Sequence, residues 1–254
     1  MERVTENHFT EQLARNYAAL WPHLFEPAAV VPAVDFLAAL ASGGAALEFG
    51  VGTGRLALPL SARGVDVHGI DLSPAMLDEL ARQPGAAAVG VTLGDIATTN
   101  VTGGAGSFAL VYLVRNTIMN LTTQDAQVAC FANAARHLRP GGKFVIEVMV
   151  PELRRLPPGT TVRVFDTGPG HLGFEEYDFA AQRSVSSHVW EGDGKTETFS
   201  APFRYAWPAE LDLMARLAGL VQRERWNDFD RSPFTSESRS HVSVWEKAAG
   251  ATEA

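Results

Sequence analysis

The chain has 254 residues, of which 46% are hydrophobic, enough to bury a sizeable core in one large domain or in one domain with an insertion. Its formal net charge of −8, from 21 basic and 29 acidic residues, provides no basic field for a phosphate backbone. We therefore expect a small-molecule partner and no nucleic acid. A single cysteine, Cys130, excludes an intramolecular disulfide and a zinc-binding cysteine cluster.

No segment predicts membrane insertion. The longest apolar stretch, 28–41, contains Pro32 and Asp35 and is too short to span a bilayer. The first six residues lack the basic and apolar run of a signal peptide. We therefore expect a cytoplasmic protein without a membrane partner.

Two helices are predicted before the first strand. Apolar residues on one helical face predict the first helix over 9–21, and they are Phe9, Leu13, Tyr17, Leu20 and Trp21. A second helix is predicted over 32–40, ending at a turn that contains Gly43 and Gly44. Residues 1–44 are expected to form a helical cap at one edge of the site.

Strands and helices then alternate through residue 150. The predicted strands are 45–49, 65–70, 89–93, 107–114 and 143–150. Helices are predicted over 55–63, from Pro74 to the Pro84-Gly85 turn, and from Thr122 to Leu138, with Ser73 and Thr122 as caps. This alternation predicts right-handed crossovers and an α/β fold with a doubly wound parallel sheet.

The pattern changes after Pro151. Strand-like alternation predicts an antiparallel β lid over 151–207, with strands at 160–166, 174–180, 184–190 and 196–207. A helix at 208–217 and strands at 220–226 and 241–245 return to the α/β core. That core is predicted to consist of 45–150 and 208–247, followed by a frayed tail over 248–254.

A glycine-rich turn follows the first strand. Gly50, Gly52 and Gly54 stand at alternate positions after Glu48, and glycine without a Cβ lets a ligand approach the backbone. The Gly-x-Gly-x-x-Gly pattern of nicotinamide dinucleotide sites would require glycine at position 55, which is Arg55. The turn therefore departs from a dinucleotide fingerprint.

Two carboxylates follow the next two strands, Asp71 and Asp95. A carboxylate at the end of a strand can bind both hydroxyls of a ribose, and one beyond the neighbouring strand can accept from an adenine amino group. A ligand with adenosine and no pyrophosphate needs such groups, because it has no phosphate to place at a helix N-terminus.

Four motifs in this order resemble those of the class I S-adenosylmethionine-dependent methyltransferases. They occupy 47–54, 69–77, 94–95 and 138–144. The resemblance implies a Rossmann-like, seven-stranded doubly wound sheet whose last strand is antiparallel, which agrees with the count of five strands plus two.

The same resemblance implies how S-adenosylmethionine is bound. The glycines approach its methionine part and Glu48 its ammonium group, Asp71 binds the ribose hydroxyls, Leu72 and Met76 flank the adenine, and Asp95 meets the adenine edge. The complete implied cofactor-binding set is Glu48, Gly50, Gly52, Gly54, Asp71, Leu72, Met76, Asp95, Ile96 and Leu113.

Outside the core, the first helix, the segment 113–121 and the β-rich insertion resemble methyltransferases of actinobacterial natural-product pathways, among them enzymes that N-methylate amino sugars. By this resemblance Tyr17 and Asn120 face a small-molecule acceptor, and Asn116 is a further acceptor-positioning candidate. Asn120 stands where some of those enzymes have histidine, which leaves the acceptor class open.

The sequence leaves open whether nitrogen, oxygen or carbon is methylated. The segment 115–120 contains no good base, and an amine needs only to be neutral whereas a hydroxyl needs a base. This favours N-methylation, although a histidine of the lid could reach the site. His171 itself reads as a solvated loop histidine.

Two other functions stay open, namely a nicotinamide-dependent oxidoreductase of Rossmann type, against which Arg55 argues, and a non-catalytic S-adenosylmethionine-binding protein. The sequence shows no His, Asp and Glu cluster with metal-ligand spacing, so no metal is predicted. A monomer or a homodimer is expected.

Overall fold

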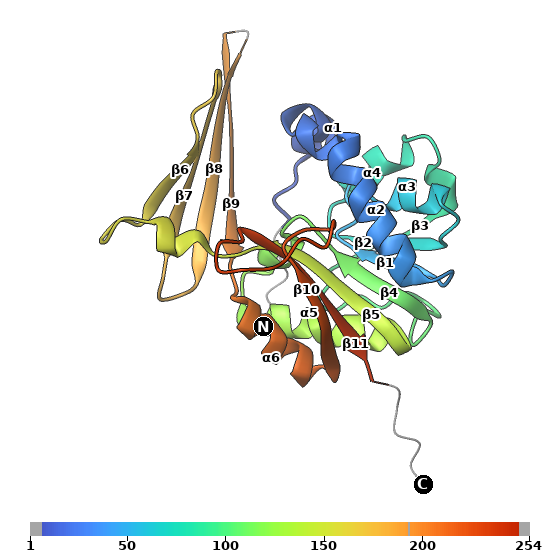
Figure 1. The fold of residues 1–254 in the computed structure, drawn as a ribbon. Coiled ribbons are helices and arrows are strands. Elements are labelled where there is room, and N and C mark those ends of the chain that lie inside the picture. Colours follow the sequence, from blue (N-terminus) through green and yellow to red (C-terminus); the bar gives the residue numbers. More distant parts are fainter. Residues whose placement is uncertain (1–6, 193, 249–254) are drawn as a thin grey trace.

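The computed structural model describes residues 7–192 and 194–248, and its centre is a seven-stranded sheet with the strand order β10-β11-β5-β4-β1-β2-β3 (Figure 1). The strands are β1 (Ala46–Phe49), β2 (Val67–Asp71), β3 (Val89–Leu93), β4 (Phe108–Leu113), β5 (Leu138–Met149), β10 (Leu220–Trp226) and β11 (Ser240–Lys247). Strands β1 to β5 pair in parallel, whereas β11 is antiparallel to β5 and β10. The predicted Rossmann-like sheet with an antiparallel last strand is confirmed.

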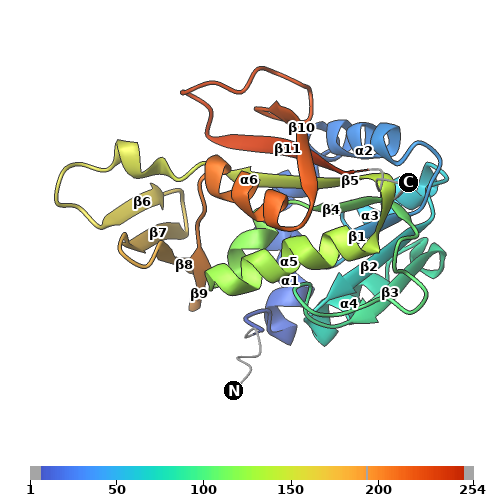
Figure 2. The same cartoon turned by 90° about the horizontal axis from the view of Figure 1, so that it is seen from below.

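Helices cover both faces of this sheet. Side chains of α2 (Pro27–Ala41), α3 (Ala57–Ala62) and α4 (Pro74–Ala81) join the apolar cluster on one face. On the other face lie α5 (Gln124–His137) and α6 (Pro208–Leu217), side by side in Figure 2. Alternate residues of the central strands β1 and β4 face opposite clusters, which is the pattern expected of strands buried on both sides.

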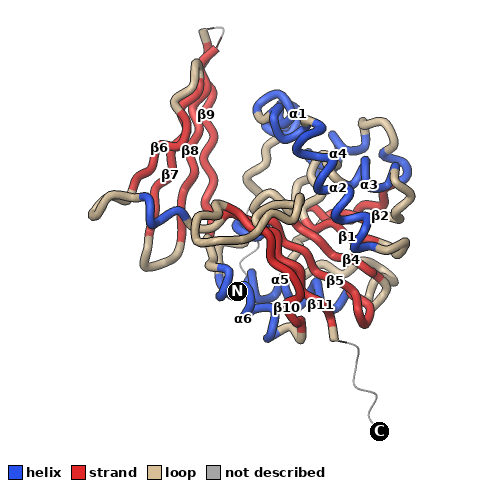
Figure 3. Tube along the Cα trace, viewed as in Figure 1, coloured by secondary structure: helices blue, strands red, loops and turns tan. Residues whose placement is uncertain are grey.

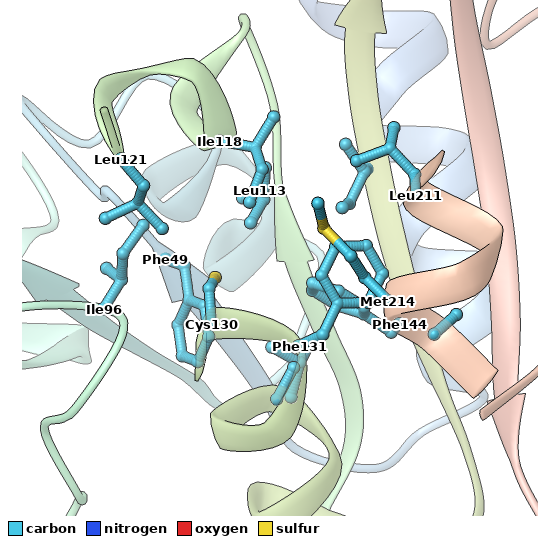
Figure 4. Close-up of a cluster of buried hydrophobic side chains, with 14 of the residues drawn as sticks. Phe49, Ile96, Leu113, Ile118, Leu121, Cys130, Phe131, Phe144, Leu211 and Met214 are labelled. Carbon is cyan, nitrogen blue, oxygen red and sulfur yellow. The ribbon is translucent and has the colours of Figure 1, made fainter. Parts of the chain in front are cut away.

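Figure 4 shows the cluster beneath α5 and α6, where Phe131 packs edge to face on Phe144 at a centroid distance of 5.1 Å. Cys130 belongs to this cluster and is fully buried, and burial raises the pKa of its thiol. The thiol therefore stays protonated and unreactive, in agreement with its predicted place in the core.

Local capping explains where two of the helices begin. Ser73 caps α4 as predicted, because its Oγ accepts from the N–H of Met76. The cap of α5 is Thr123, whose Oγ1 accepts from Ala126, so the prediction of Thr122 was wrong by one residue.

The predicted start of the second helix was also wrong. Helix α2 begins at Pro27, because the carbonyl of Glu26 already accepts from Ala29 and Val30. Pro32 therefore lies inside the helix rather than at its first position.

A separate antiparallel sheet lies beside the core, with the strand order β6-β7-β8-β9 (Figure 3). Its strands are β6 (Val162–Asp166), β7 (His171–Asp178), β8 (Arg183–Gly192) and β9 (Lys195–Arg204). The last strand ends three residues before the predicted 207, since Trp207 already precedes α6. This four-stranded sheet is called the lid sheet below.

The lid sheet contacts the rest of the protein in two places, near the end of helix α1 and at helices α5 and α6. Trp21, which ends helix α1 (Glu11–Leu20), meets the rings of His188 and Trp190 edge to face at 5.9 and 5.8 Å. At the base, the buried Arg204 of β9 donates to Glu210 of α6 at 2.6 Å and to Gln127 of α5 at 2.5 Å. The lid sheet is thus tied to the helices on one face of the core.

Residues 1–6 of the predicted cap and 249–254 of the predicted tail lie outside the described part of the chain.

Candidate active site

A cavity lies where the carboxyl ends of β1, β2 and β4 approach the N-terminal segment and α1. Most of the residues expected to bind the cofactor or the acceptor line it, namely Tyr17, Glu48, Gly50, Gly52, Asp71, Leu72, Met76, Asp95, Ile96 and Asn120. Their convergence follows from the parallel sheet, because such strands end at one common edge. We call this space the first cavity.

The glycine turn shapes one wall of the first cavity. Gly50 and Gly52 have positive φ values of 74° and 54°, a conformation that favours glycine. A Cβ on Gly50 would lie 2.6 Å from Cγ2 of Thr117, so this glycine lets the turn pack against the neighbouring 3₁₀ helix. A Cβ on Gly52 would meet nothing within 4 Å, so at this residue the backbone borders open space.

Two expected cofactor residues do not reach the first cavity. Gly54 is buried, and a Cβ there would meet Leu58 at 2.9 Å, so its role is close packing of the turn on α3. Leu113 is fully buried in the core beneath α5 and α6. Both residues lie in the packed interior, outside the lining of the first cavity, and their contact with a ligand stays a prediction.

Asp71 connects the end of β2 to the glycine turn. Its Oδ2 accepts from the N–H of Gly52 at 2.7 Å, and its Oδ1 accepts from that of Ser73 at 2.9 Å. Burial raises the pKa of this carboxyl, whereas the backbone donors oppose the rise. A carboxylate has further lone pairs, so Asp71 can hold the turn and still accept from two ligand hydroxyls.

Glu48 is the most deeply buried acid of the first cavity. Burial raises its pKa to about 8, although the hydroxyl of Tyr112 donates to its Oε2 at 2.9 Å and favours the carboxylate. Arg55 lines the same cavity and donates from Nη1 to the carbonyl of Leu24 at 3.3 Å. A ligand that brings a cation to Glu48 would stabilise the ionised form of Glu48.

A second cavity separates α1 and the segment after β4 from the inner face of the lid sheet. Its lining comprises Phe9, Tyr17, Trp21, Arg115, Asn116, Met119, Asn120, Met149, Arg163, Phe165, Glu175, Ser186, His188, Phe199 and Phe203. Among the described residues, the two cavities share Phe9, Tyr17, Arg115 and Asn120. These four residues therefore mark the junction where two ligands would meet.

The three acceptor candidates take different places at this junction. Tyr17 packs its ring 4.9 Å from that of Trp21, and burial raises the pKa of its hydroxyl. Asn120 donates from Nδ2 to the carbonyl of Thr117 at 3.2 Å, which leaves its Oδ1 as an acceptor. Asn116 borders only the second cavity, and its Oδ1 accepts from the N–H of Met149 at 2.7 Å.

Several polar residues of the second cavity come from the lid sheet and were not predicted as site residues. Arg163 pairs with Glu152 at 2.9 Å, and Glu175 accepts from Tyr177 at 2.5 Å. His188 lines the cavity with Ser186, two positions away on the same strand. Strand alternation puts such residues on one face, but the sequence does not reveal which face turns toward the core.

Within 7–192 and 194–248, no three His, Cys, Asp or Glu side chains are grouped to hold a metal ion. None of the helices in this described part is long and apolar enough to cross a membrane.

The chain is similar to several known proteins. A family model described as a methyltransferase domain matches residues 46–142. The structure of the CcbJ methyltransferase from Streptomyces caelestis is similar over 96% of this chain and 99% of CcbJ, with 37% sequence identity and a TM-score of 0.83.

Two further similar proteins are more distant. The cypemycin N-terminal methyltransferase of a Streptomyces species is 27% identical over 208 residues, which span 81% of this chain and 84% of that protein. S-adenosylmethionine-bound CalS10, an amino pentose methyltransferase from Micromonospora echinaspora, shares the fold with a TM-score of 0.63 at 23% identity, covering 86% of this chain and 89% of CalS10.

Proposed function

Because the chain belongs to the class I S-adenosylmethionine-dependent methyltransferases, we propose that it methylates a nitrogen atom of a small-molecule amine held in the second cavity. S-adenosylmethionine is the methyl donor of this family, and it supplies an electrophilic methyl group on a sulfonium when bound. The polar groups of the first cavity fit this ligand. The proposal therefore concerns the acceptor and the residues that hold both ligands.

We assign the donor to the first cavity on the chemistry of its lining. Open space beside the Gly52 backbone admits the methionine part, and Glu48 offers a buried partner for its ammonium group. Asp71 offers acceptors for the ribose hydroxyls, and Leu72 and Met76 offer apolar surface for the adenine. Asp95 and Ile96 lie in the same lining, in the place expected for the adenine edge.

The residues at the junction of the two cavities support nitrogen as the methylated atom. These four residues, Phe9, Tyr17, Arg115 and Asn120, have neither a carboxylate nor an imidazole, and Glu175 and His188 line the second cavity outside this junction. Burial lowers the pKa of His188 to about 4, so this imidazole is a weak base for a hydroxyl. Asn120 Oδ1 and the Tyr17 oxygen can accept from the N–H groups of an amine and so direct its lone pair. The cypemycin enzyme is named for an N-terminal amine, which supports the same atom class.

We further propose that residues 151–207 act as the acceptor lid and that 45–150 with 208–247 hold the donor. Methyl transfer is an in-line displacement that needs alignment and exclusion of water more than proton chemistry. The aromatic inner face of the lid sheet, with Phe165, Phe199 and Phe203, provides an apolar wall for this purpose.

The test is a methyl-transfer assay with matched acceptor panels. Purified protein and S-adenosylmethionine are incubated with amines, such as peptides with a free N-terminus and amino sugars, and with phenols and amine-free sugars. We expect release of S-adenosylhomocysteine with members of the amine panel only. Turnover of hydroxyl compounds alone would contradict N-methylation, and binding of S-adenosylhomocysteine without any turnover would favour a non-catalytic role.

A further inference from the structure

Three side chains of the lid sheet form a hydrogen-bonded row that starts in the second cavity. His188 lines that cavity, and its Nδ1 lies 3.0 Å from Nε2 of His171 on the neighbouring strand β7. Nδ1 of His171 lies 2.9 Å from Oδ2 of Asp166 at the end of β6. The two imidazole planes differ by 9° with centroids 5.2 Å apart, so their nitrogen atoms meet edge to edge.

The row leads from the acceptor space to solvent. The side chains of His171 and Asp166 are 19% and 47% exposed. Around His188 the cavity wall is aromatic, with Phe165 at 5.3 Å and Trp21 at 5.9 Å between ring centroids. The hydrogen bonds between His188, His171 and Asp166 thus provide a path for a proton from the cavity to the surface.

We propose that His188, His171 and Asp166 form a relay that takes the proton of the amine acceptor from the second cavity to the exposed edge of the lid sheet. The proposal rests on N-methylation as the function. It assigns His188 to contact with the acceptor, and His171 and Asp166 to positioning and proton transfer.

The hydrogen-bonding roles follow from the outer end of the row. Hydrogen bonds from the N–H of Gly168 and from His171 lower the pKa of Asp166, which is therefore an ionised carboxylate that only accepts. His171 then donates from Nδ1, and its neutral Nε2 accepts from Nδ1 of His188. This leaves the lone pair on Nε2 of His188, which lies 3.4 Å from Oγ of Ser186.

The proton step balances within the row. One N–H bond of the acceptor ammonium breaks, its electron pair becomes the lone pair of the amine, and the proton bonds to Nε2 of His188. The proton on Nδ1 of His188 moves to Nε2 of His171. The positive charge then lies on His171 beside the Asp166 carboxylate, and the neutral amine is free to attack the methyl group.

The surroundings of His188 disfavour its protonated form, so a proton that it accepts is transferred to His171. Burial lowers the pKa of His188 to about 4, and the charge that His171 carries once it is protonated and the charge of Arg115 act in the same direction while Asp166 opposes them. Two other charged residues of the cavity, Arg163 and Glu175, pair with Glu152 and Tyr177. His188 is therefore neutral at pH 7 and passes the proton onward to His171.

The first experiment determines the protonation of the two histidines in the row and needs no acceptor. Long-range ¹⁵N NMR of the histidine-labelled full chain reports which ring nitrogen carries the proton. We expect His188 in the Nδ1–H form, and a change of its tautomer in Asp166→Asn or His171→Gln. A wild-type His188 with the proton on Nε2 would overturn the relay.

The second experiment measures kcat/KM against pH with the best amine of the panel, for wild type, His188→Gln, His171→Gln and Asp166→Asn. We expect each variant to lose activity roughly 10-fold or more at pH 7 and to recover above the pKa of the amine. Affinity for S-adenosylhomocysteine should not change. His23→Gln makes the same chemical change at an exposed residue outside both cavities and should match wild type.

The outcomes separate the relay from the function on which it rests. If wild type and variants turn over an amine with the same pH profile, or if the variants lose activity equally at every pH, the relay is wrong and N-methylation stands. No turnover of any amine overturns the N-methylation proposal and the relay together. Asp166→Asn lies at the exposed edge and provides the test if His188→Gln does not fold.

Discussion

The hydroxyl of Tyr112 donates to Oε2 of Glu48 at 2.9 Å between directly paired residues of β4 and β1. Both side chains are buried, and burial raises the pKa of Glu48 to about 8. At pH 7 the carboxyl is therefore mostly protonated, and an ammonium group beside it would favour its ionisation. If the donor binds at Glu48 as proposed, its affinity should depend on pH.

Donor binding at pH 7 should release close to one proton. Pairing with the ammonium group requires the Glu48 carboxylate, so affinity should rise with pH and level off near pH 8. Calorimetry with S-adenosylhomocysteine in buffers of different ionisation enthalpy measures the released proton. Glu48→Gln should bind more weakly with no release from this site, and an unchanged proton count in that variant would contradict the assignment.

Ionisation of Glu48 should also lower the stability of the folded protein at high pH. Its folded pKa of about 8 is above the model-compound value of 4.5, so the protonated form favours folding, and its contribution is complete below pH 4.5 and lost as pH rises through 8. Glu48→Gln cannot ionise. The melting temperature of the variant relative to wild type should therefore increase between pH 5 and pH 9, and a constant difference across this range would argue against the raised pKa.

Gly50→Ala and Gly52→Ala should fail in different ways. Both replace a positive-φ glycine, but only the new Cβ at position 50 would strike Thr117, at 2.6 Å. We expect Gly50→Ala to lower the melting temperature more, with partial rescue by Thr117→Ser, which removes the clashing methyl group. Gly52→Ala should retain the fold and lose affinity for S-adenosylhomocysteine.

Gly64→Ala is the matched control for these two variants. Its φ of 85° imposes the same kind of strain, its Cβ would meet nothing within 4 Å, and it borders neither cavity. It should cost about 1–2 kcal/mol in stability and leave ligand affinity intact. Wild-type affinity in Gly52→Ala would contradict the proposed position of the donor.

Asp71→Asn should weaken binding of S-adenosylhomocysteine by about 10- to 100-fold, because charge-assisted hydrogen bonds contribute about 1.5–3 kcal/mol each. The amide also cannot accept from both Gly52 and Ser73 as the carboxylate does. Asp66→Asn makes the same change at an exposed residue directly before the same strand and should bind normally. Equal affinities of the two variants in calorimetry would rule out the role of Asp71.

Arg204→Met should destabilise the protein by about 1.5–3 kcal/mol, because the half-buried Glu210 loses a charge-assisted hydrogen bond and keeps only its amide donors, Gln124 and Gln182. Arg204 is 5% exposed and joins the lid sheet to α5 and α6 through Glu210 and Gln127. Arg63→Met breaks the exposed pair with Asp35 and should cost at most about 1 kcal/mol. Urea denaturation compares the two, and similar losses would show that the buried pair is not the main tie.

Local signals account for the parts of the fold that were predicted well. Helix α6 at Pro208–Leu217 and strand β10 at Leu220–Trp226 have the predicted bounds, because a proline at the first helical position and a glycine between the elements mark the limits. Where two equivalent signals stood close together, as with Thr122 and Thr123, the choice depended on which side chain reaches a free backbone N–H.

The sequence by itself determined the seven-stranded fold, the presence of a four-stranded lid sheet and half of the lining of the first cavity. Strand and helix periods are local, and the ends of parallel strands share one edge, so motif order along the chain was enough to bring Glu48, Asp71 and Asp95 together. Only the tertiary structure decided that Gly54 and Leu113 are buried and lie outside the lining of that cavity.

The second cavity was likewise decided by tertiary structure. A strand period assigns residues to a face but does not say which face meets the core, so His188, Glu175 and Arg163 gave no signal as site residues. Packing of the lid sheet against Trp21 selects the inner face and lines up His188 with His171 and Asp166. The first cavity could be predicted from the order of the motifs along the chain, whereas the second cavity exists only where the lid sheet meets the core.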